Sequence, residues 1–309
     1  PKILVIGDLI IDKYLWGECE RISPEAPVQV VNIKNENTVL GGAGNVVNNL
    51  KSLGAKVDII SVIGDCKTSN NLKKLLDEIG VSTKYLIKQE NRITPKKSRI
   101  IASHQQVVRY DYESLDEIDL TSQGLIINVL NKIIKDYEVV LLSDYGKGIL
   151  TENLTQLIIK SAKKHNIKVL ADPKGLNYSK YKGSFLLTPN KKEASEASRI
   201  TIEDNNSLKK AIKKIKDECH LEVSIITLSE DGIAIYDNNL RTLPTAAREV
   251  YDVTGAGDTI LASLGFALSC NYDIDSAVEF SNLAAGVVVG KIGSSTATIN
   301  EIIEYESSL

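Results

Sequence analysis

Short apolar runs alternate along the chain with stretches in which apolar residues recur every three or four positions. Runs of strand length occur at 3–6, 56–64, 139–143, 169–171, 185–187 and 223–227. Stretches with helical spacing occur at 72–79, 121–136, 151–165, 205–219 and 277–290. Apolar runs of this kind are typical of strands buried on both faces. Their alternation with helices predicts an α/β fold, with a mostly parallel central sheet and helices on both faces.

Two segments interrupt this alternation, at about 13–33 and 95–112. Both contain short, weakly alternating apolar runs, and the second is expected to turn near Ser103 and His104. Alternation of this kind predicts short strands outside the main sheet. We expect a small β-sheet that closes over the core as a lid. A dimer surface is the alternative, and one sheet can serve both roles.

Composition narrows the function. The chain has 309 residues and a net charge of −3, which gives no basic field for binding nucleic acid. Its length allows about two domains, but composition does not change along it, so we expect one core with a lid over 1–309. No apolar run approaches the ~18 residues of a membrane span. Four scattered cysteines and three histidines predict a cytoplasmic protein without a metal cluster.

The most informative stretch is Asp-Val-Thr-Gly-Ala-Gly-Asp at 252–258. A polar, strand-like segment at 248–251 precedes it, and a helical run of small apolar residues at 260–269 follows. The pattern predicts a glycine-rich turn at a helix N-terminus, whose free N–H groups bind an anion. Phosphate repels the carboxylate of Asp258, but that carboxylate is useful if it takes the proton of a hydroxyl attacking the phosphate. We therefore expect a kinase.

Polar residues follow several of the predicted strands, and carboxyl ends of parallel strands share one edge of a sheet. Asp12 follows the first strand, where ligands of open α/β sheets bind, although a turn acid fits the spacing equally well. Gly41-Gly42-Ala43-Gly44-Asn45 forms a second glycine-rich turn into a helix. Close packing of helix on strand explains such a cluster about as often as a ligand does.

These motifs, in this order, resemble the ribokinase/PfkB family of sugar kinases across nearly the whole chain. The resemblance rests on 41–45, 190–193, 252–258 and the helix around Asn282. Within the family, the chain looks closest to heptose 7-phosphate kinases in the segments 21–28, 105–109, 142–148, 172–175, 249–254 and 286–291. The resemblance implies a ribokinase-like three-layer α/β/α core with a β-sheet lid, and a homodimer through that lid.

It also implies a reaction. ATP, with Mg²⁺, would phosphorylate the C1 hydroxyl of D-glycero-β-D-manno-heptose 7-phosphate, a step of ADP-heptose synthesis for lipopolysaccharide. Asp258 would be the base, and the N–H groups of Gly255, Ala256 and Gly257 would hold the developing charge. The positions that match binding of sugar hydroxyls are Asp12, Gly42 and Asn45.

The resemblance assigns further residues to ATP and Mg²⁺. Asn190 and Glu193 would hold Mg²⁺ and phosphate largely through water, although a first-turn helix acid explains Glu193 alone equally well. The remaining ATP positions are Thr227, Ser229, Gly232 and, at the adenine, Asn282.

A sugar phosphate also needs cations. The candidates are Arg21, Lys97, Arg99, Arg109, Lys147 and Lys174, for each of which surface solvation is the alternative. Arg109 and Lys147 are favoured because each lies in a segment like those of the heptose kinases. The role of His104 stays open.

Rival interpretations remain. A kinase of the same family could act on another sugar phosphate or a nucleoside. A catalytically silent sugar- or nucleotide-binding regulator is disfavoured because Asp258 and both glycines are intact. Many relatives carry a nucleotidyltransferase with a His-x-Gly-His-type motif, which this sequence lacks, so a stand-alone kinase or an excised domain is expected.

Overall fold

The central sheet contains six parallel strands in the order β10-β9-β8-β1-β4-β5. The computed structural model describes residues 1–102, 105–291 and 293–309. The strands are β1 (Lys2–Gly7), β4 (Lys56–Ile63), β5 (Leu86–Lys88), β8 (Val139–Ser143), β9 (Lys168–Asp172) and β10 (Leu186–Leu187). The predicted parallel sheet is confirmed.

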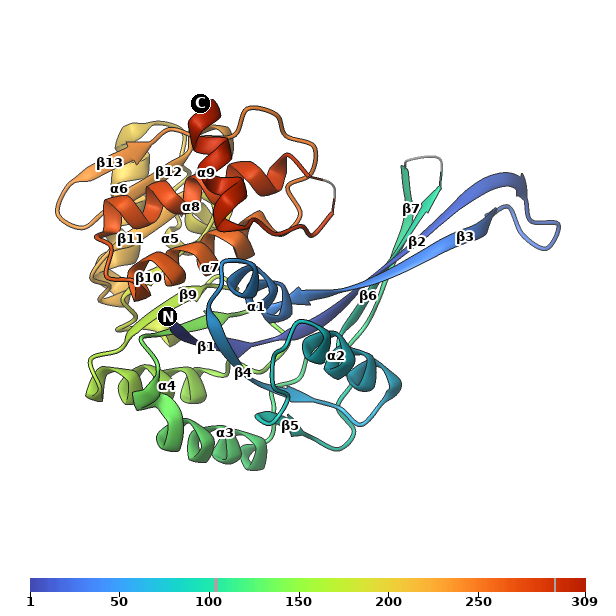
Figure 1. Ribbon diagram of the computed structural model, residues 1–309, viewed down its shortest axis with the longest axis horizontal. Helices are drawn as coiled ribbons and strands as arrows, with labels where there is room; N and C mark the ends of the chain where they lie inside the picture. The colour runs from blue at the N-terminus through green and yellow to red at the C-terminus, as the bar shows by residue number, and fades with distance from the viewer. Residues whose placement is uncertain (103–104, 292) are drawn as a thin grey trace.

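Alternate side chains of β1 enter two separate cores, one on each face of the sheet. Ile3 and Val5 pack into one core, Leu4 and Ile6 into the other, and all four are fully buried. The first face is covered by α1 (Ala43–Ser52), α2 (Lys67–Glu78), α7 (Ala256–Ser269) and α8 (Ile274–Val289). The second face is covered by α3 (Leu120–Ile133), α4 (Glu152–Lys164), α5 (Lys191–Ser198) and α6 (Asn205–Cys219). The result is the expected three-layer α/β/α core (Figure 1).

An antiparallel sheet extends the core beyond β10. Its strands are β11 (Ser224–Thr227), β12 (Ile233–Tyr236) and β13 (Leu240–Leu243), and a bridge between Asn190 and Thr227 joins it to the end of β10. Helix α9 (Ile299–Ser308) packs on α8, and single 3-10 turns occur at η1 (Ile134–Asp136), η2 (Ser179–Tyr181) and η3 (Ser229–Asp231). The apolar pattern missed the short strands β5, β12 and β13 and the helix α9.

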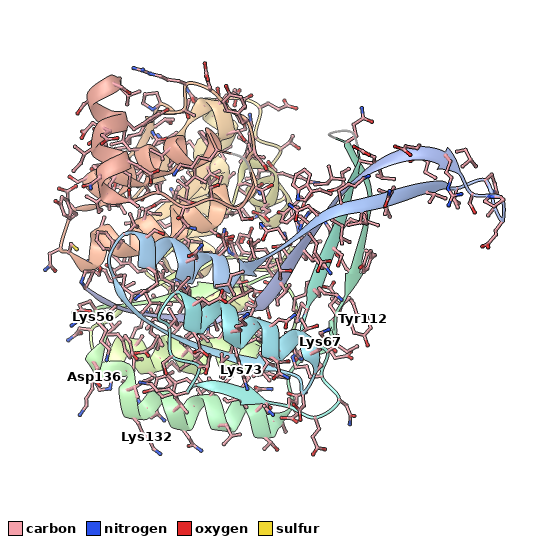
Figure 2. All side chains as sticks on the ribbon, turned by 45° about the vertical axis from the view of Figure 1, so that its right-hand side comes forward. Lys56, Lys67, Lys73, Tyr112, Lys132 and Asp136 are labelled. Carbon is pink, nitrogen blue, oxygen red and sulfur yellow. The ribbon has the colours of Figure 1, made fainter. Side chains whose placement is uncertain are left out.

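The lid is a four-stranded sheet that projects from one edge of the core (Figure 1). Its order is β3-β2-β6-β7, with β2 (Leu9–Ile22), β3 (Gln29–Gly42), β6 (Lys96–Ala102) and β7 (Gln105–Tyr112). The expected segment 13–33 was too short, because the buried Leu9, Ile10 and Ile11 look like core although they begin β2. In Figure 2, side chains leave both faces of this sheet, and Tyr112 lies at its end nearest the core. The turn expected at Ser103 and His104 lies outside the described residues.

One predicted element is wrong. The segment 248–251 forms a loop and not a strand. The N–H groups of Tyr251 and Asp252 donate to the carbonyl oxygen of Val289 at 2.8 and 3.2 Å, which ties this loop to the end of α8. Its backbone bonds therefore go to a helix end and not to a neighbouring strand. Among the described residues, no helix is long and apolar enough to cross a membrane.

Candidate active site

Asp258 lies in the first turn of α7, as predicted, and only 4% of it is exposed. Its Oδ2 accepts a hydrogen bond from Nδ2 of Asn45, and its Oδ1 accepts one from the hydroxyl of Tyr145, both at 2.8 Å. Two donors from different parts of the chain therefore fix the orientation of the carboxylate.

The surroundings of Asp258 bring its pKa close to neutral pH. Burial raises the pKa of Asp258 to about 6, and the negative charge of Asp12 adds to this effect. The hydrogen bonds from Asn45 and Tyr145 and the positive charge of Lys97 act in the opposite direction. A carboxylate that is ionised at pH 7 and has a pKa near 6 is well suited to accept a proton during a reaction.

Asn45 is held in place by the packing of α1 on α7. Only 2% of Asn45 is exposed, and Asn49 donates to its carbonyl oxygen at 2.9 Å. Thr259, next to Asp258, donates to Oδ1 of Asn49 at 3.0 Å. Gly255 leaves room for this arrangement, because its φ is +81° and a Cβ there would lie 2.6 Å from Nδ2 of Asn45. The glycine-rich turn and the Asn45 helix therefore form one unit.

Tyr145 is carried by the loop after β8, which the buried carboxylate of Asp8 organises. Asp8 accepts N–H bonds from Tyr145 at 2.8 Å, from Lys147 at 3.1 Å and from Ile149 at 3.3 Å. Burial, followed by the charge of Asp144, raises the pKa of Asp8, and the three N–H bonds oppose this. The sequence analysis assigned no role to Asp8 or Tyr145. Their positions directly after strands, the feature used for Asp12, were the available signal.

Strand register brings four predicted sugar-site residues onto one face of the lid. Asp12 pairs with Lys97, and Tyr14, two residues along β2, pairs with Arg99, which in turn pairs with Arg109. Paired residues, and residues two apart on one strand, share a face of a sheet. Arg99 closes this face with an ion pair from Nη1 to Oδ1 of Asp12 at 2.5 Å.

Most of the candidate cations already have carboxylate partners. Arg109 makes a two-point contact with Asp111 at 2.7 and 3.0 Å. Lys147 pairs with Glu113 at 2.6 Å, and Lys174 pairs with Glu193 at 3.0 Å. The two cations that the sequence favoured, Arg109 and Lys147, are thus compensated within the chain.

Lys97 differs from these cations. Its half-buried ammonium group has no hydrogen bond or ion pair within the described chain, and it lies 5.5 Å from the centre of the Tyr145 ring. Burial, followed by repulsion from Lys147, lowers the pKa of Lys97. An incoming anion would relieve both effects.

Within a single chain, Arg21 does not lie near Asp12 and the cations of the lid face. It lies nine residues beyond Asp12 on β2, which corresponds to roughly 30 Å at about 3.3 Å per residue. It is exposed near the far end of the lid. Its role in binding substrate stays a prediction, as does that of His104, which lies outside the described residues.

A hollow of about 470 Å³ adjoins the turn at 255–257. Its lining includes the predicted ATP residues Thr227, Ser229, Gly232 and Asn282, together with Ala256 and Gly257. Asn282 also holds the segment before the turn in place, since its Nδ2 donates to the carbonyl oxygen of Pro244 at 2.6 Å. Residues from β11, η3, α7 and α8 therefore meet around one cavity.

The amides at the start of α7 are only partly free. The N–H of Ala256 donates to the carbonyl oxygen of Val253 at 3.2 Å. Within the described chain, those of Gly255, Gly257 and Asp258 have no acceptor. Unpaired N–H groups at a helix N-terminus favour an anion there.

Asn190 and Glu193 form a capping box at the start of α5. Asn190 Oδ1 accepts the N–H of Glu193 at 3.0 Å, and Glu193 Oε2 accepts the N–H of Asn190 at 3.1 Å. The alternative explanation of Glu193, that it is an acid stabilising the first turn of a helix, therefore agrees with the structure. Nearby, burial, followed by the charges of Asp258 and Glu193, holds the pKa of Asp172 well above its usual range. The sequence analysis gave Asp172 no role.

Comparison with known proteins agrees with this arrangement. A model of the pfkB family of carbohydrate kinases matches residues 1–301. The chain belongs to this family. It is an ATP-dependent sugar kinase, so the expected enzyme class is confirmed.

Relatives of this kinase include longer proteins. The bifunctional protein HldE of Aliarcobacter butzleri is 65% identical over 309 residues, which is 100% of this chain and 65% of that protein. HldE of Sulfurimonas denitrificans is 59% identical with the same coverage. The chain thus spans just under two thirds of the length of these relatives.

Solved structures share the fold at low identity. Phosphofructokinase-2 from Escherichia coli in complex with potassium has a TM-score of 0.81 at 18% identity and covers 99% of this chain and 98% of its own. Arabidopsis thaliana ribokinase complexed with ribose and ATP has a TM-score of 0.76 at 18% identity, with the same coverage. The ribokinase-like fold predicted from the sequence is confirmed.

Proposed function

We propose that this kinase transfers the γ-phosphate of ATP to the C1 hydroxyl of D-glycero-β-D-manno-heptose 7-phosphate, in the synthesis of ADP-heptose for lipopolysaccharide. The observation that carries the proposal is the position of Asp258, which is buried directly after Gly257 of the hollow and within the influence of the charges of Asp12 and Lys97 on the lid. The identity of the sugar is supported by the segments that resemble heptose 7-phosphate kinases and by the relatives named HldE.

Asp258 acts as the base. The attacking anomeric hydroxyl is neutral at pH 7, so its proton must leave as it bonds to phosphorus. With Oδ1 and Oδ2 each accepting one hydrogen bond, the carboxylate keeps a second lone pair on either oxygen for this proton. Proton removal of this kind typically contributes ~10²–10⁴-fold to the rate.

The start of α7 supplies the complementary positive field. Gly257 lines the hollow, and its free N–H group, with those of Gly255 and Asp258 in the same turn, would hold the phosphate oxygens. Because these donors are fixed by the helix, they do not need to reorganise as charge develops. The hollow itself has the size and the mixed lining expected of a nucleotide site.

The residues present fit Mg²⁺ held mainly by water and phosphate. No group of three or more His, Cys, Asp or Glu side chains with metal-binding geometry occurs among the described residues. Mg²⁺ usually keeps several waters and needs only one or two carboxylates. Asn190 and Glu193 would hold it through water. Bound there, Mg²⁺ would neutralise charge on the phosphates.

Lys97 is the best candidate for the sugar phosphate. It shares a lid face with Asp12, and it is the half-buried candidate cation without a carboxylate partner in the described chain. Arg109 stays a candidate, because Asp111 can release it to a phosphate, which accepts two parallel bonds from arginine equally well.

A homodimer through the lid is supported by apolar side chains on a projecting sheet. Exposed examples are Trp16, Ile22, Val28, Ile33, Val107, Val108, Tyr110 and Tyr112. Exposed apolar side chains gathered on one sheet favour an interaction surface. We propose that the whole of 1–309 acts as one kinase unit, and that it works in a reducing, cytoplasmic compartment, with which its four free thiols are consistent.

A substrate panel tests the proposal. With ATP and Mg²⁺, we expect kcat/KM to be highest for heptose 7-phosphate among heptose 7-phosphate, fructose 6-phosphate, ribose and adenosine. A clear preference for ribose or adenosine would overturn the assigned substrate. ATP binding, measured separately by calorimetry, should persist in the Asp258→Asn variant while turnover is lost.

A further inference from the structure

A tyrosine hydroxyl makes direct contact with the proposed base. The hydroxyl of Tyr145 donates to Oδ1 of Asp258 at 2.8 Å, on the oxygen that Asn45 leaves free. Tyr145 is half-buried and reaches Asp258 from the loop after β8, which is 113 residues away in the chain. This contact therefore depends on how firmly that loop is held.

The loop is anchored at both ends of the tyrosine. The Tyr145 N–H donates to Oδ2 of Asp8 at 2.8 Å, and the Gly146 N–H donates to Oδ1 of Asp144 at 2.8 Å. Asp144 is in turn held by Lys180 at 2.5 Å and by the hydroxyl of Tyr181 at 2.6 Å. Both carboxylates are buried, so the backbone that carries Tyr145 has little freedom to move.

Several charges surround the pair, and each comes from a different element. Asp12 on β2 and Asp172 on β9 disfavour negative charge on the Tyr145 oxygen, as does Asp258 itself. Lys97 on β6 lies over the Tyr145 ring. Burial and these carboxylates hold the pKa of Tyr145 well above its usual range. At neutral pH the tyrosine is therefore protonated and can donate to the ionised Asp258.

We propose that Tyr145 is a positioning residue that holds Asp258 ionised and aims its carboxylate at the sugar hydroxyl. This inference rests on the proposed function, because it takes Asp258 as the base. A hydrogen bond donated to a carboxylate stabilises the charged form. Tyr145 thus partly offsets the burial that pushes Asp258 toward its neutral form, and it leaves the remaining lone pairs free for the substrate.

The consequence is a defined change in pH dependence. Loss of the hydroxyl removes a bond that favours the ionised carboxylate, so the pKa of Asp258 rises above about 6. A rise of about one unit leaves roughly fivefold less base at pH 6 and nearly the same amount at pH 8. The Tyr145→Phe variant should therefore be most impaired in acid, with the acid limb of its kcat/KM profile about one pH unit higher than that of the wild type.

Tyr137→Phe is the matched control. Tyr137 is a buried tyrosine next to β8, and its hydroxyl, like that of Tyr145, donates to a carboxylate, here Oδ2 of Asp58 at 2.7 Å. It precedes β8, whereas Tyr145 follows it, so it lies at the opposite edge of the sheet. It loses the same kind of bond and should leave the pH profile of phosphorylation unchanged.

The test measures kcat/KM against pH for the wild type, Tyr145→Phe, Tyr137→Phe and Asp258→Asn. A profile of Tyr145→Phe that coincides with the wild type, while Asp258→Asn is inactive, overturns the inference and leaves the proposed function standing. Turnover by Asp258→Asn overturns the proposed base and the inference together.

A second measurement does not depend on folding of Tyr145→Phe or on activity. In the wild type labelled with ¹³C at tyrosine Cζ, the Tyr145 signal should shift with a midpoint near pH 6, and this step should be absent in Asp258→Asn. A Tyr145 signal that is flat across this range in the wild type would contradict the proposed contact.

Discussion

Replacing Gly255 by alanine is the smallest change that reaches the proposed base. The new Cβ would lie 2.6 Å from Nδ2 of Asn45, far inside van der Waals contact, at a backbone φ of +81°. Asn45 cannot retreat, because it is buried and bonded to both Asn49 and Asp258. Either the turn or the Asn45–Asp258 bond must give way.

Two costs follow from this geometry. A residue with a side chain at such a φ costs about 1–3 kcal/mol. A hydrogen bond to a charged group contributes about 1.5–3 kcal/mol, part of which is lost if Asn45 is displaced. We expect the free energy of unfolding of Gly255→Ala to fall by about 2–4 kcal/mol. The pKa of Asp258 should rise as well, because Asn45 also favours its ionised form.

Urea unfolding and the pH dependence of kcat measure these effects. Two glycines without a neighbour within 4 Å of an added Cβ provide controls. Gly257→Ala, in the same turn, should unfold no more easily than the wild type, and Gly124→Ala, within α3, should leave both stability and activity intact. The reasoning is refuted if Gly255→Ala unfolds within about 0.5 kcal/mol of the wild type and keeps its pH profile.

Three further predictions follow from charge and exposure. Lys97→Gln should raise KM for the sugar phosphate at least tenfold without changing KM for ATP. The control Lys13→Gln should change neither, because Lys13 is one residue along β2 from Asp12 and so lies on the opposite lid face. Equal effects of the two substitutions would contradict the assignment of Lys97. Because burial raises the pKa of Asp258 to about 6, ionisation of Asp258 destabilises the fold as pH rises from about 4 to 6. The free energy of unfolding of Asp258→Asn should therefore increase by up to about 3 kcal/mol relative to that of the wild type between pH 4 and pH 8. A difference in thermal stability that stays constant with pH would count against this. Val108→Lys, on the exposed lid, should weaken self-association at least tenfold, as measured by sedimentation. The control Leu120→Lys, at a residue that is 81% exposed at the start of α3, should not weaken it. A dimer unchanged by Val108→Lys, or a monomeric wild type, would exclude the lid interface.

The core of the fold could be predicted because buried parallel strands have a simple sequence signature. Continuous apolar runs such as 139–143 appear where the structure has β8, and the helical spacing at 205–219 coincides with α6. The pattern failed where a buried apolar run belongs to a lid strand and not to the central sheet. Leu9, Ile10 and Ile11 are buried like core residues, yet they begin the lid, so the lid seemed shorter than it is.

The site was only partly predictable. Asp258 and the glycine-rich turn are local features, because the helix N-terminus that they form is encoded by adjacent residues. The contacts of Asp258 with Asn45 and Tyr145 join residues 213 and 113 positions away in the chain, and spacing carries no information about them. Pairing of cations is also invisible in the sequence, so it gave no sign that Arg109 and Lys147 have carboxylate partners and that Lys97 has none in the described chain.

The position of the new phosphate tests the central claim most directly. The kinase is incubated with ATP, Mg²⁺ and D-glycero-β-D-manno-heptose 7-phosphate, and the product is examined by ³¹P NMR with proton coupling. We predict a second phosphate signal coupled to the anomeric proton, formed by the wild type and not by Asp258→Asn. A phosphate attached at any other carbon, or the same product from Asp258→Asn, would contradict the account.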